Sequence, residues 1–307
     1  RLMVLTALRR RGQIDDALAK CLDHPLAPKY RKERNILRLG AAQILFLGTK
    51  AHGAVDQTVA LAGRSTLRGL INAVLRRLTR EGAAIVEAQD APRLATPDWL
   101  WAQWTKGFGE SNARAIAATH LAQPPLDVTV KSDPDAWAQR LGGTVTPTGS
   151  VRIMDAGAVP GLAGFDDGDW WVQDTASSIP AQLLLGALEN PSETRIADLC
   201  AAPGGKTAQL CFSGATVTAV DRSANRLKRL RKNLARLGLS ATVIAEDAVD
   251  WRPPNPMDGV LLDAPCTATG IIRRRPDILW AKDPTSADKM SGVQARLLKA
   301  AAANLLK

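Results

Sequence analysis

One stretch, Ile196–Thr207, constrains the fold of this chain more than any other part of its sequence. A short apolar run ends at Cys200, Pro203–Gly205 then offers a turn without bulky side chains, and a helical pattern follows. This order predicts a buried parallel strand, a tight turn and a helix. Glycines in such a turn let a ligand approach the backbone, and the N–H groups of the following helix attract anionic groups. The stretch indicates a nucleotide-type cofactor site, although a plain glycine turn between packed elements has the same pattern.

The chain from Trp170 onward alternates strand-like and helical segments. The apolar runs are Arg195–Leu199, Thr216–Val220, Thr242–Ala245 and Gly259–Leu262, and helical segments such as Arg222–Leu237 lie between them. This alternation is typical of a βαβ series and a mostly parallel sheet. Ligands of such sheets bind at the carboxyl ends of the strands.

Acidic residues stand near the ends of these runs. They are Asp198, Asp221, Asp247 and Asp263. One such residue alone is usually a helix cap or a turn former. Three of them at successive strand ends, after a glycine loop, favour a site. Asp221 has the place at which a carboxylate accepts hydrogen bonds from a ribose.

Three cofactor classes are compatible with the loop itself. A phosphate-binding P-loop fits Gly205-Lys206-Thr207, but the first glycine that it requires is Cys200 here. A dinucleotide loop requires a third spaced glycine, which is absent. These departures weaken a nucleoside triphosphate and NAD relative to S-adenosylmethionine, but the loop alone leaves all three cofactors open.

The excess of basic residues lies at the start of the chain. Residues 1–82 hold 16 Lys and Arg against 6 Asp and Glu, whereas residues 83–307 hold 24 of each. A basic module favours nucleic acid as its partner over a merely solvated surface. The pattern is helical, with one predicted helix at Lys32–Leu47 that Gly48 ends. A second predicted helix has an apolar stripe on one face, formed by Leu67, Leu70, Ile71, Val74, Leu75 and Leu78. The flanking arginines are Arg68, Arg76, Arg77 and Arg80.

The middle of the chain changes composition twice. The stretch 81–123 is rich in Ala and Trp, and we expect Trp99, Trp101 and Trp104 to pack between elements rather than stack on bases. Short β-branched segments then follow at Asp127–Lys131, Gly142–Pro147 and Val151–Met154, and they predict a small α+β module.

Composition excludes several other classes. No apolar run approaches the ~20 residues that span a bilayer, so we expect a cytoplasmic protein without a membrane partner. The cysteines (Cys21, Cys200, Cys211, Cys266) and histidines (His24, His52, His120) are scattered, which indicates neither a disulfide framework nor a metal site. Because the chain lacks an initiator methionine and stops at Lys307 after a helical pattern, we expect it to be a fragment.

A thiol and an arginine cluster follow the last strand-like run. Asp263-Ala-Pro-Cys266 precedes Arg273, Arg274 and Arg275. A cysteine near the edge of the sheet, beside a cofactor loop and arginines, favours a reactive thiol over a small buried residue. The arginines suggest a phosphate clamp for a nucleic-acid substrate.

These motifs resemble the RNA 5-methylcytosine methyltransferases of the Sun/NOP family. The two central signatures are Cys200-Ala-Ala-Pro-Gly-Gly-Lys206 and Asp263-Ala-Pro-Cys266. Further matches lie at Ile272–Trp280, at Trp171–Ser177 and, for a NusB-like start, at Ala54–Val55 and Leu70–Arg76. The resemblance covers nearly the whole chain. It implies methylation of carbon 5 of a cytosine in RNA, expected to be 16S ribosomal RNA, by a monomer that uses S-adenosylmethionine.

The resemblance also assigns roles to residues. Those implied to hold S-adenosylmethionine are Cys200, Ala201, Ala202, Pro203, Gly204, Gly205, Lys206, Asp221, Arg226, Asp247 and Asp263. Asp221 would hold the ribose, Asp247 would lie near the adenine, and Asp263 would face the reaction centre. The catalytic residues are Cys266 and Asp263, and the reaction passes through a covalent bond between a cysteine and carbon 6. The family's attacking cysteine lies in a later Thr-Cys-Ser motif, which would follow Lys307, so Cys266 is implied to assist release.

The predicted fold is multidomain. Residues 1–88 would form an all-α NusB-like RNA-binding bundle, residues 89–168 linker helices and a small α+β RNA-contacting domain, and residues 169–307 a Rossmann-like methyltransferase domain. Three alternatives remain: a non-catalytic NusB-like RNA-binding or antitermination factor, a tRNA 5-methylcytosine methyltransferase, and a P-loop NTPase. An amino-methyltransferase would carry an Asn/Asp-Pro-Pro-Tyr motif, in place of which this chain has Asp263–Cys266.

Overall fold

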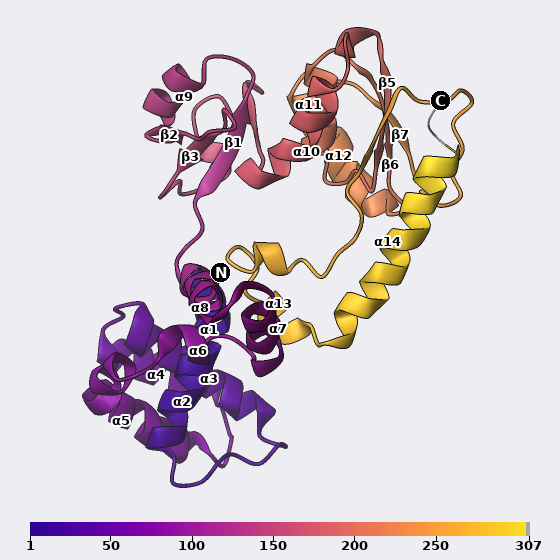
Figure 1. Cartoon of the computed structure of the whole chain (residues 1–307). Helices are drawn as coiled ribbons and strands as arrows, with labels where there is room; N and C mark the ends of the chain where they lie inside the picture. The colour runs from indigo at the N-terminus through magenta and orange to yellow at the C-terminus, as the bar shows by residue number, and fades with distance from the viewer. Residues whose placement is uncertain (305–307) are drawn as a thin grey trace. The chain divides into compact units, whose positions relative to one another are not determined.

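The computed structural model describes residues 1–304. These residues divide into two compact units (Figure 1). The first unit comprises Arg1–Gln123 and Ala268–Ser286, and the second comprises Pro124–Thr267 and the residues from Ala287 onward. The three-domain division from sequence stays a prediction.

The first unit is helical. Its helices are α1 (Leu2–Arg9), α2 (Arg11–Cys21), α3 (Arg31–Phe46), α4 (Ala51–Leu61), α5 (Arg68–Glu87), α6 (Ala91–Leu94), α7 (Asp98–Phe108), α8 (Glu110–Leu121), η3 (Thr269–Ile271) and α13 (Ile278–Ala281). The predicted helix at Lys32–Leu47 is α3, and Gly48 beyond it has the left-handed φ of +61° that ends helices.

The stripe on α5 forms part of the first core. Ile71, Val74, Leu75 and Leu78 are buried, and they share one cluster with residues of α2, α3 and α4. Leu70 is 38% exposed and Leu67 is half-buried, so the prediction was too wide at the start of the helix. The flanking arginines remain at the surface because a guanidinium is costly to bury without a partner.

A second core of this unit contains tryptophan. Trp104 is buried in a cluster with Leu100, Ala113 and Ala117, and Trp99 and Trp101 pack against it. The guanidinium groups of Arg93 and Arg114 lie 5.3 and 5.6 Å from the Trp101 ring. The tryptophans therefore pack between elements, as predicted. The same cluster includes Ile272, Ile278 and Leu279, which explains why the segment Ala268–Ser286 belongs with the first unit.

The second unit begins with an antiparallel sheet in the order β2-β3-β1-β4. Its elements are β1 (Leu126–Val130), α9 (Pro134–Leu141), β2 (Thr144–Val145), β3 (Val151–Ile153), η1 (Val159–Gly161) and β4 (Trp170–Val172). The three predicted β-branched segments are confirmed as β1, β2 and β3. β4, which begins the region predicted as Rossmann-like, pairs with β1.

A parallel sheet in the order β7-β6-β5-β8 completes this unit, and Figure 1 labels β5, β6 and β7. Its elements are α10 (Thr175–Gly186), η2 (Pro191–Glu193), β5 (Arg195–Leu199), α11 (Gly205–Phe212), β6 (Thr216–Val220), α12 (Ala224–Arg236), β7 (Thr242–Ile244), β8 (Gly259–Leu262) and α14 (Thr285–Asn304). All four predicted parallel strands are confirmed. α12 covers one face through Leu227, Leu230 and Leu234, and Leu297 and Ala301 of α14 cover the other.

Hydrogen bonds tie the antiparallel sheet to α10. The buried carboxylate of Asp127 accepts two bonds of 2.8 Å from Arg152 and one of 3.1 Å from the backbone N–H of Thr175. Burial raises the pKa of Asp127, but these donors lower it more, to about 2. Gln173 accepts a 2.9 Å bond from the Trp171 indole and donates one of 2.9 Å to Gln209 of α11. These bonds join the antiparallel sheet to α10 and α11. Within residues 1–304, no helix is both long and apolar enough to cross a membrane.

Two glycines of the first unit predict opposite effects of alanine. A Cβ on Gly12 of α2 would lie 1.6 Å from the carbonyl oxygen of Leu94 in α6, whereas one on Gly69 of α5 would meet nothing within 4 Å. We expect Gly12→Ala to lower the free energy of unfolding by ~1–3 kcal/mol because the helices must separate. Gly69→Ala should raise it by up to ~1 kcal/mol, since alanine loses less backbone entropy. Urea unfolding of both variants checks this, and equal losses in the two would contradict it.

Candidate functional site

The loop after β5 is shaped by positive backbone angles. Cys200 has φ of +61° and Gly204 has φ of +101°, and α11 starts at Gly205. A Cβ on Gly204 would lie 2.8 Å from Cγ of Leu230 in α12, so this position needs glycine for both its angle and its packing. A Cβ on Gly205 would meet only ordinary contacts near 3.9 Å. The glycine turn thus brings α11 and α12 close together at the carboxyl end of β5.

Asp221 fastens this loop to the end of β6. Its side chain is only 2% exposed. Oδ2 accepts a 3.2 Å bond from the N–H of Ala202, and Oδ1 accepts a 2.9 Å bond from the N–H of Ser223. Arg226 lies 3.4 Å from the same carboxylate and donates to the carbonyl oxygen of Ala202. The structure therefore brings together three predicted cofactor-binding residues on adjoining segments.

A second ion pair joins the loop to the segment after β8. Nζ of Lys206 lies 2.8 Å from Oδ2 of Asp263. The lysine side chain is largely buried, whereas that of Asp263 is 58% exposed. The backbone N–H of Asp263 also donates to the carbonyl oxygen of Leu199 at 3.3 Å. The two signature motifs of the sequence thus meet at one edge of the parallel sheet.

The electrostatics around Cys200 show that the predicted carboxylates converge. Burial raises the pKa of the Cys200 thiol to about 11, and the charges of Asp221, Asp263 and Asp247 add to this rise. Arg226 acts in the opposite direction. Asp247 also accepts a 3.0 Å bond from the N–H of Val249, the turn-forming role that a lone aspartate commonly has. All three carboxylates therefore lie within electrostatic reach of the glycine loop.

Asp198 is one of the acidic residues near the strand ends, but it is not among the residues predicted to hold the cofactor. Its carboxyl is buried in β5, and Oδ2 accepts a 2.6 Å bond from the Thr207 hydroxyl. Oδ1 has no hydrogen-bond partner among residues 1–304. Burial raises the pKa of Asp198 to about 7, opposed by Thr207 and Lys206. Its place at the strand end was the available signal, but the sequence does not show which oxygen is left unsatisfied.

Cys266 lies in the loop that carries Asp263. Its side chain is exposed, whereas Cys200 and Cys211 are half-buried and Cys21 is buried. Burial raises the pKa of Cys211 to about 12, which makes that thiol a poor nucleophile. Gln294 of α14 donates a 2.9 Å bond to the carbonyl oxygen of Pro265 and so holds the loop beside Cys266.

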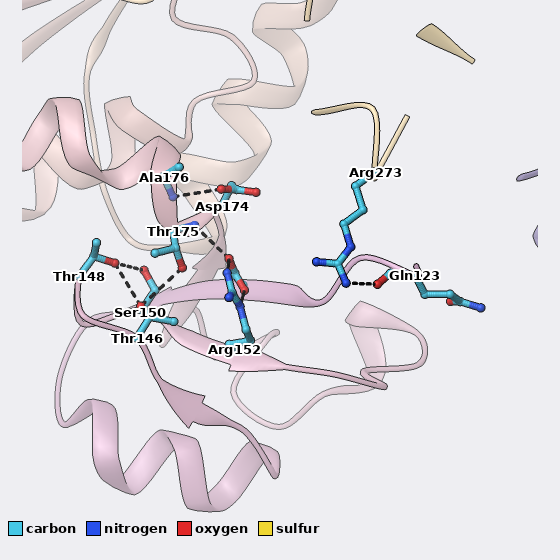
Figure 2. Close-up of polar contacts among 10 residues, drawn as sticks. Gln123, Thr146, Thr148, Ser150, Arg152, Asp174, Thr175, Ala176 and Arg273 are labelled. Carbon is cyan, nitrogen blue, oxygen red and sulfur yellow. Dashed lines mark hydrogen bonds and ion pairs between the residues drawn. The ribbon is translucent and has the colours of Figure 1, made fainter. Parts of the chain in front are cut away.

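The arginine cluster has contacts of its own in the first unit. Arg273 donates a 2.7 Å bond to the carbonyl oxygen of Gln123 (Figure 2). Arg275 forms a two-pronged ion pair with Asp277, which raises the pKa of the guanidinium. Arg274 is half-exposed. The clamp by Arg273, Arg274 and Arg275 stays a prediction, and two of its guanidinium groups hold the local fold. No cluster of potential metal ligands occurs in the described part of the chain.

The pKa of Asp198 predicts a pH-dependent stability. Its pKa of about 7 in the folded protein lies above the ordinary value of 3.8. Between these two pH values, the folded protein retains a proton that the unfolded chain releases. The free energy of unfolding should therefore fall as the pH rises from about 4 to about 7. The Asp198→Asn variant has no ionisable group at this position, so its free energy of unfolding should fall less over this pH range. Urea unfolding of both proteins from pH 4 to pH 8 measures the difference, and parallel curves would contradict the assignment.

Comparisons with known proteins agree with the two signature motifs, Cys200–Lys206 and Asp263–Cys266. The family model "16S rRNA methyltransferase RsmB/F" matches residues 185–307, and the NusB family model matches residues 1–80. Ribosomal RNA small subunit methyltransferase B of Xanthomonas campestris is 37% identical over 313 residues, covering 95% of this chain and 70% of the relative. The protein of that name from Pseudomonas putida is 34% identical over 314 residues, covering 95% of this chain and 71% of the relative.

Solved structures show a similar fold. The crystal structure of PH0851 aligns with a TM-score of 0.77 and 21% identity, covering 100% of this chain and 74% of the other. The structure of NSun6 from Pyrococcus horikoshii with SFG aligns with a TM-score of 0.57 and 18% identity, covering 67% and 79%. These likenesses support the fold, and the sequence relatives establish the family. This chain belongs to the family of the 16S rRNA methyltransferases RsmB/F.

Proposed function

We propose that this protein transfers a methyl group from S-adenosylmethionine to carbon 5 of a cytosine in 16S ribosomal RNA. The carrying observation is the 2.8 Å ion pair between Lys206 and Asp263, which joins the glycine loop to the segment of Cys266. A donor site and a thiol that lie side by side suit methylation of a pyrimidine carbon. The names of the relatives support ribosomal RNA as the substrate. Such a substrate would place the enzyme in the cytoplasm.

The residues of the loop fit S-adenosylmethionine. Bound there, it would supply an electrophilic methyl group. The buried carboxylate of Asp221 still has lone pairs for ribose hydroxyls, because each oxygen accepts one backbone bond. Oδ1 of Asp198, which has no partner among the described residues, suits the ammonium of the methionine part. This fit favours a cationic nucleoside over a triphosphate, whose phosphates the carboxylates would repel.

The remaining donor-site assignments are proposals as well. Asp247 would lie near the adenine, and Asp263 would face the reaction centre. The backbone of the loop would pass along the ligand. The residues proposed for this role are Cys200, Ala201, Ala202, Pro203, Gly204, Gly205, Lys206 and Arg226.

Cytosine needs covalent activation because its carbon 5 is a weak nucleophile. A cysteine thiolate adds its electron pair to carbon 6. The electrons of the 5,6 double bond move into the rest of the ring, and carbon 5 becomes the nucleophilic carbon of an enamine. Asp263 would stabilise the adduct by passing a proton to ring nitrogen 3, with the Lys206 ammonium beside it as the source of that proton. Carbon 5 then takes the methyl group, and the bond between that group and the sulfur of the donor breaks. A base removes the carbon 5 proton, the double bond reforms, and the thiolate leaves.

We propose that Cys266 assists the release of the product. It is exposed and lies three residues after Asp263, so the two groups share one loop. In this assignment another cysteine, in the Thr-Cys-Ser motif implied by the resemblance, attacks carbon 6. The Lys206 ammonium would hold the Asp263 carboxylate near the target ring.

The first 80 residues are proposed to bind RNA. They match the NusB family, and their basic excess suits a polyanion. The same proposal divides the chain into domains at residues 1–88, 89–168 and 169–307. It also includes contacts of the middle module with RNA and a monomeric enzyme.

A methyl-transfer assay tests the proposed reaction. The protein is given S-adenosylmethionine with a labelled methyl group and 16S rRNA transcribed without modification. We expect label in 5-methylcytosine at a single position, and no label in a transfer RNA transcript. Label in another base, or only in the transfer RNA, would contradict the assignment.

Substitution of Cys266 separates its two possible roles. In Cys266→Ser we expect turnover to fall at least ~100-fold, by the loss of an acid–base group. Because attack would remain possible, a covalent protein–RNA complex should accumulate on a denaturing gel. Cys211→Ala is the matched control, and it should keep its activity. Loss of turnover without the complex would instead identify Cys266 as the attacking thiol.

A further inference from the structure

The segment around α12 has an unusual charge pattern. Residues 222–236 contain seven basic residues and no Asp or Glu. They are Arg222, Arg226, Lys228, Arg229, Arg231, Lys232 and Arg236. The balance of charges over residues 83–307 hides this local excess. The proposed reaction does not explain it, since only Arg226 has a role there.

Three of these cations have contacts within the second unit. Arg226 reaches Asp221 and the carbonyl oxygen of Ala202. Arg231 donates a 3.2 Å bond to the carbonyl oxygen of Val243. Arg236 donates to carbonyl oxygens of the antiparallel module and lies 4.2 Å from the ring centre of Phe165. These three side chains support the fold or the donor loop.

The side chains of the other four are exposed and form no hydrogen bond or ion pair with the part of the chain that the structure describes. They are Arg222, Lys228, Arg229 and Lys232, here called the α12 basic face. Successive residues of a helix are ~100° apart, so Lys228, Arg229 and Lys232 fall on the side opposite the buried leucines. Arg222 lies in the turn before the helix. The face is therefore free to meet a ligand.

The arrangement is unfavourable for a helix without a partner. Like charges at i,i+4, such as Lys228 and Lys232, repel each other. The first turn holds no acidic residue, although acidic side chains are favoured there. By contrast, α2 pairs its surface charges at i,i+4, as Arg11 with Asp15 and Lys20 with Asp16. A polyanion would relieve the repulsion on α12.

The position of α12 connects this face to the donor site. The helix begins three residues after Asp221, at the carboxyl end of β6. Arg226 in its first turn contacts the loop that we assign to S-adenosylmethionine. A strand of RNA that places its cytosine at this edge would continue past the start of α12. Phosphate groups there would meet Arg222 first and Lys232 last.

We propose that the α12 basic face binds the phosphate backbone of the RNA substrate beside the target cytosine. This inference rests on the proposed function. A membrane surface is a poorer occupant, because helices that lie on bilayers combine cations with Trp, Phe or Leu on the side that enters the lipid. Every leucine within α12 is buried against the sheet. The face has charge and no apolar anchor, which suits a sequence-independent phosphate contact.

The test compares two triple variants of equal composition. One is Lys228→Gln, Arg229→Gln, Lys232→Gln on α12, and the other is Lys289→Gln, Arg296→Gln, Lys299→Gln on the exposed surface of α14. The affinity for unmodified 16S rRNA is measured from 50 to 300 mM KCl. Each lost phosphate contact lowers the salt slope by ~0.7–0.9, so the α12 variant should lose about two units of slope. The α14 control should keep the slope of the parent protein.

Two further measurements keep the outcomes distinct. Calorimetry with S-adenosylhomocysteine should give the same affinity for the parent and both triple variants, which shows that the donor loop is intact. The single variant Arg222→Gln, which lies outside the helix, should lower the salt slope of RNA binding by ~0.7–0.9. This variant tests the inference even if the triple change disturbs α12. Unchanged slopes in the α12 and Arg222 variants, or an equal loss in the α14 control, would overturn the inference. A parent protein that binds neither ligand would overturn the proposed function itself.

Discussion

The buried carboxylate of Asp221 is the interaction on which the donor site depends. It accepts backbone N–H groups from two segments, Ala202 of the glycine loop and Ser223 before α12, and it attracts Arg226. A carboxylate in this position satisfies donors that the turn would otherwise bury, and an unmet buried donor costs ~1–3 kcal/mol. The same group is the one proposed to receive a ribose. In that proposal, the oxygen atoms that hold the loop together are also the ones that bind the ligand.

The rest of the second unit brings further chemistry to this point. Lys206 links the glycine loop to Asp263, and Gln294 of α14 holds the loop of Cys266. The antiparallel sheet is joined to α10 through Asp127 and to α11 through Gln173. Since these contacts hold the antiparallel sheet against α10 and α11, and Trp171 of β4 packs with Ala201 and Ala202, the module at β1–β4 has a defined place beside the donor loop. A substrate bound to that module would thus have a fixed relation to the reacting groups.

Much of the fold was predictable from local patterns. The strands β5, β6 and β8 have the predicted bounds, because a buried parallel strand is a continuous apolar run with turn residues at its ends. The features that were not predicted depend on tertiary contacts. Ile272 and Ile278 join the core of the first unit, although their segment follows the last strand of the second. The open oxygen of Asp198 and the contacts of Arg273 likewise depend on neighbours distant in the chain. Charge counts over long segments also concealed the α12 basic face.

The central claim is that the loop between β5 and α11 binds S-adenosylmethionine. Titration calorimetry of the protein with S-adenosylmethionine, S-adenosylhomocysteine, ATP and NAD tests it most directly, with Asp221→Ala as the variant. We predict one bound molecule of either adenosyl ligand, no heat from ATP or NAD, and loss of binding in the variant. Binding of ATP or NAD without affinity for the adenosyl ligands would contradict the account.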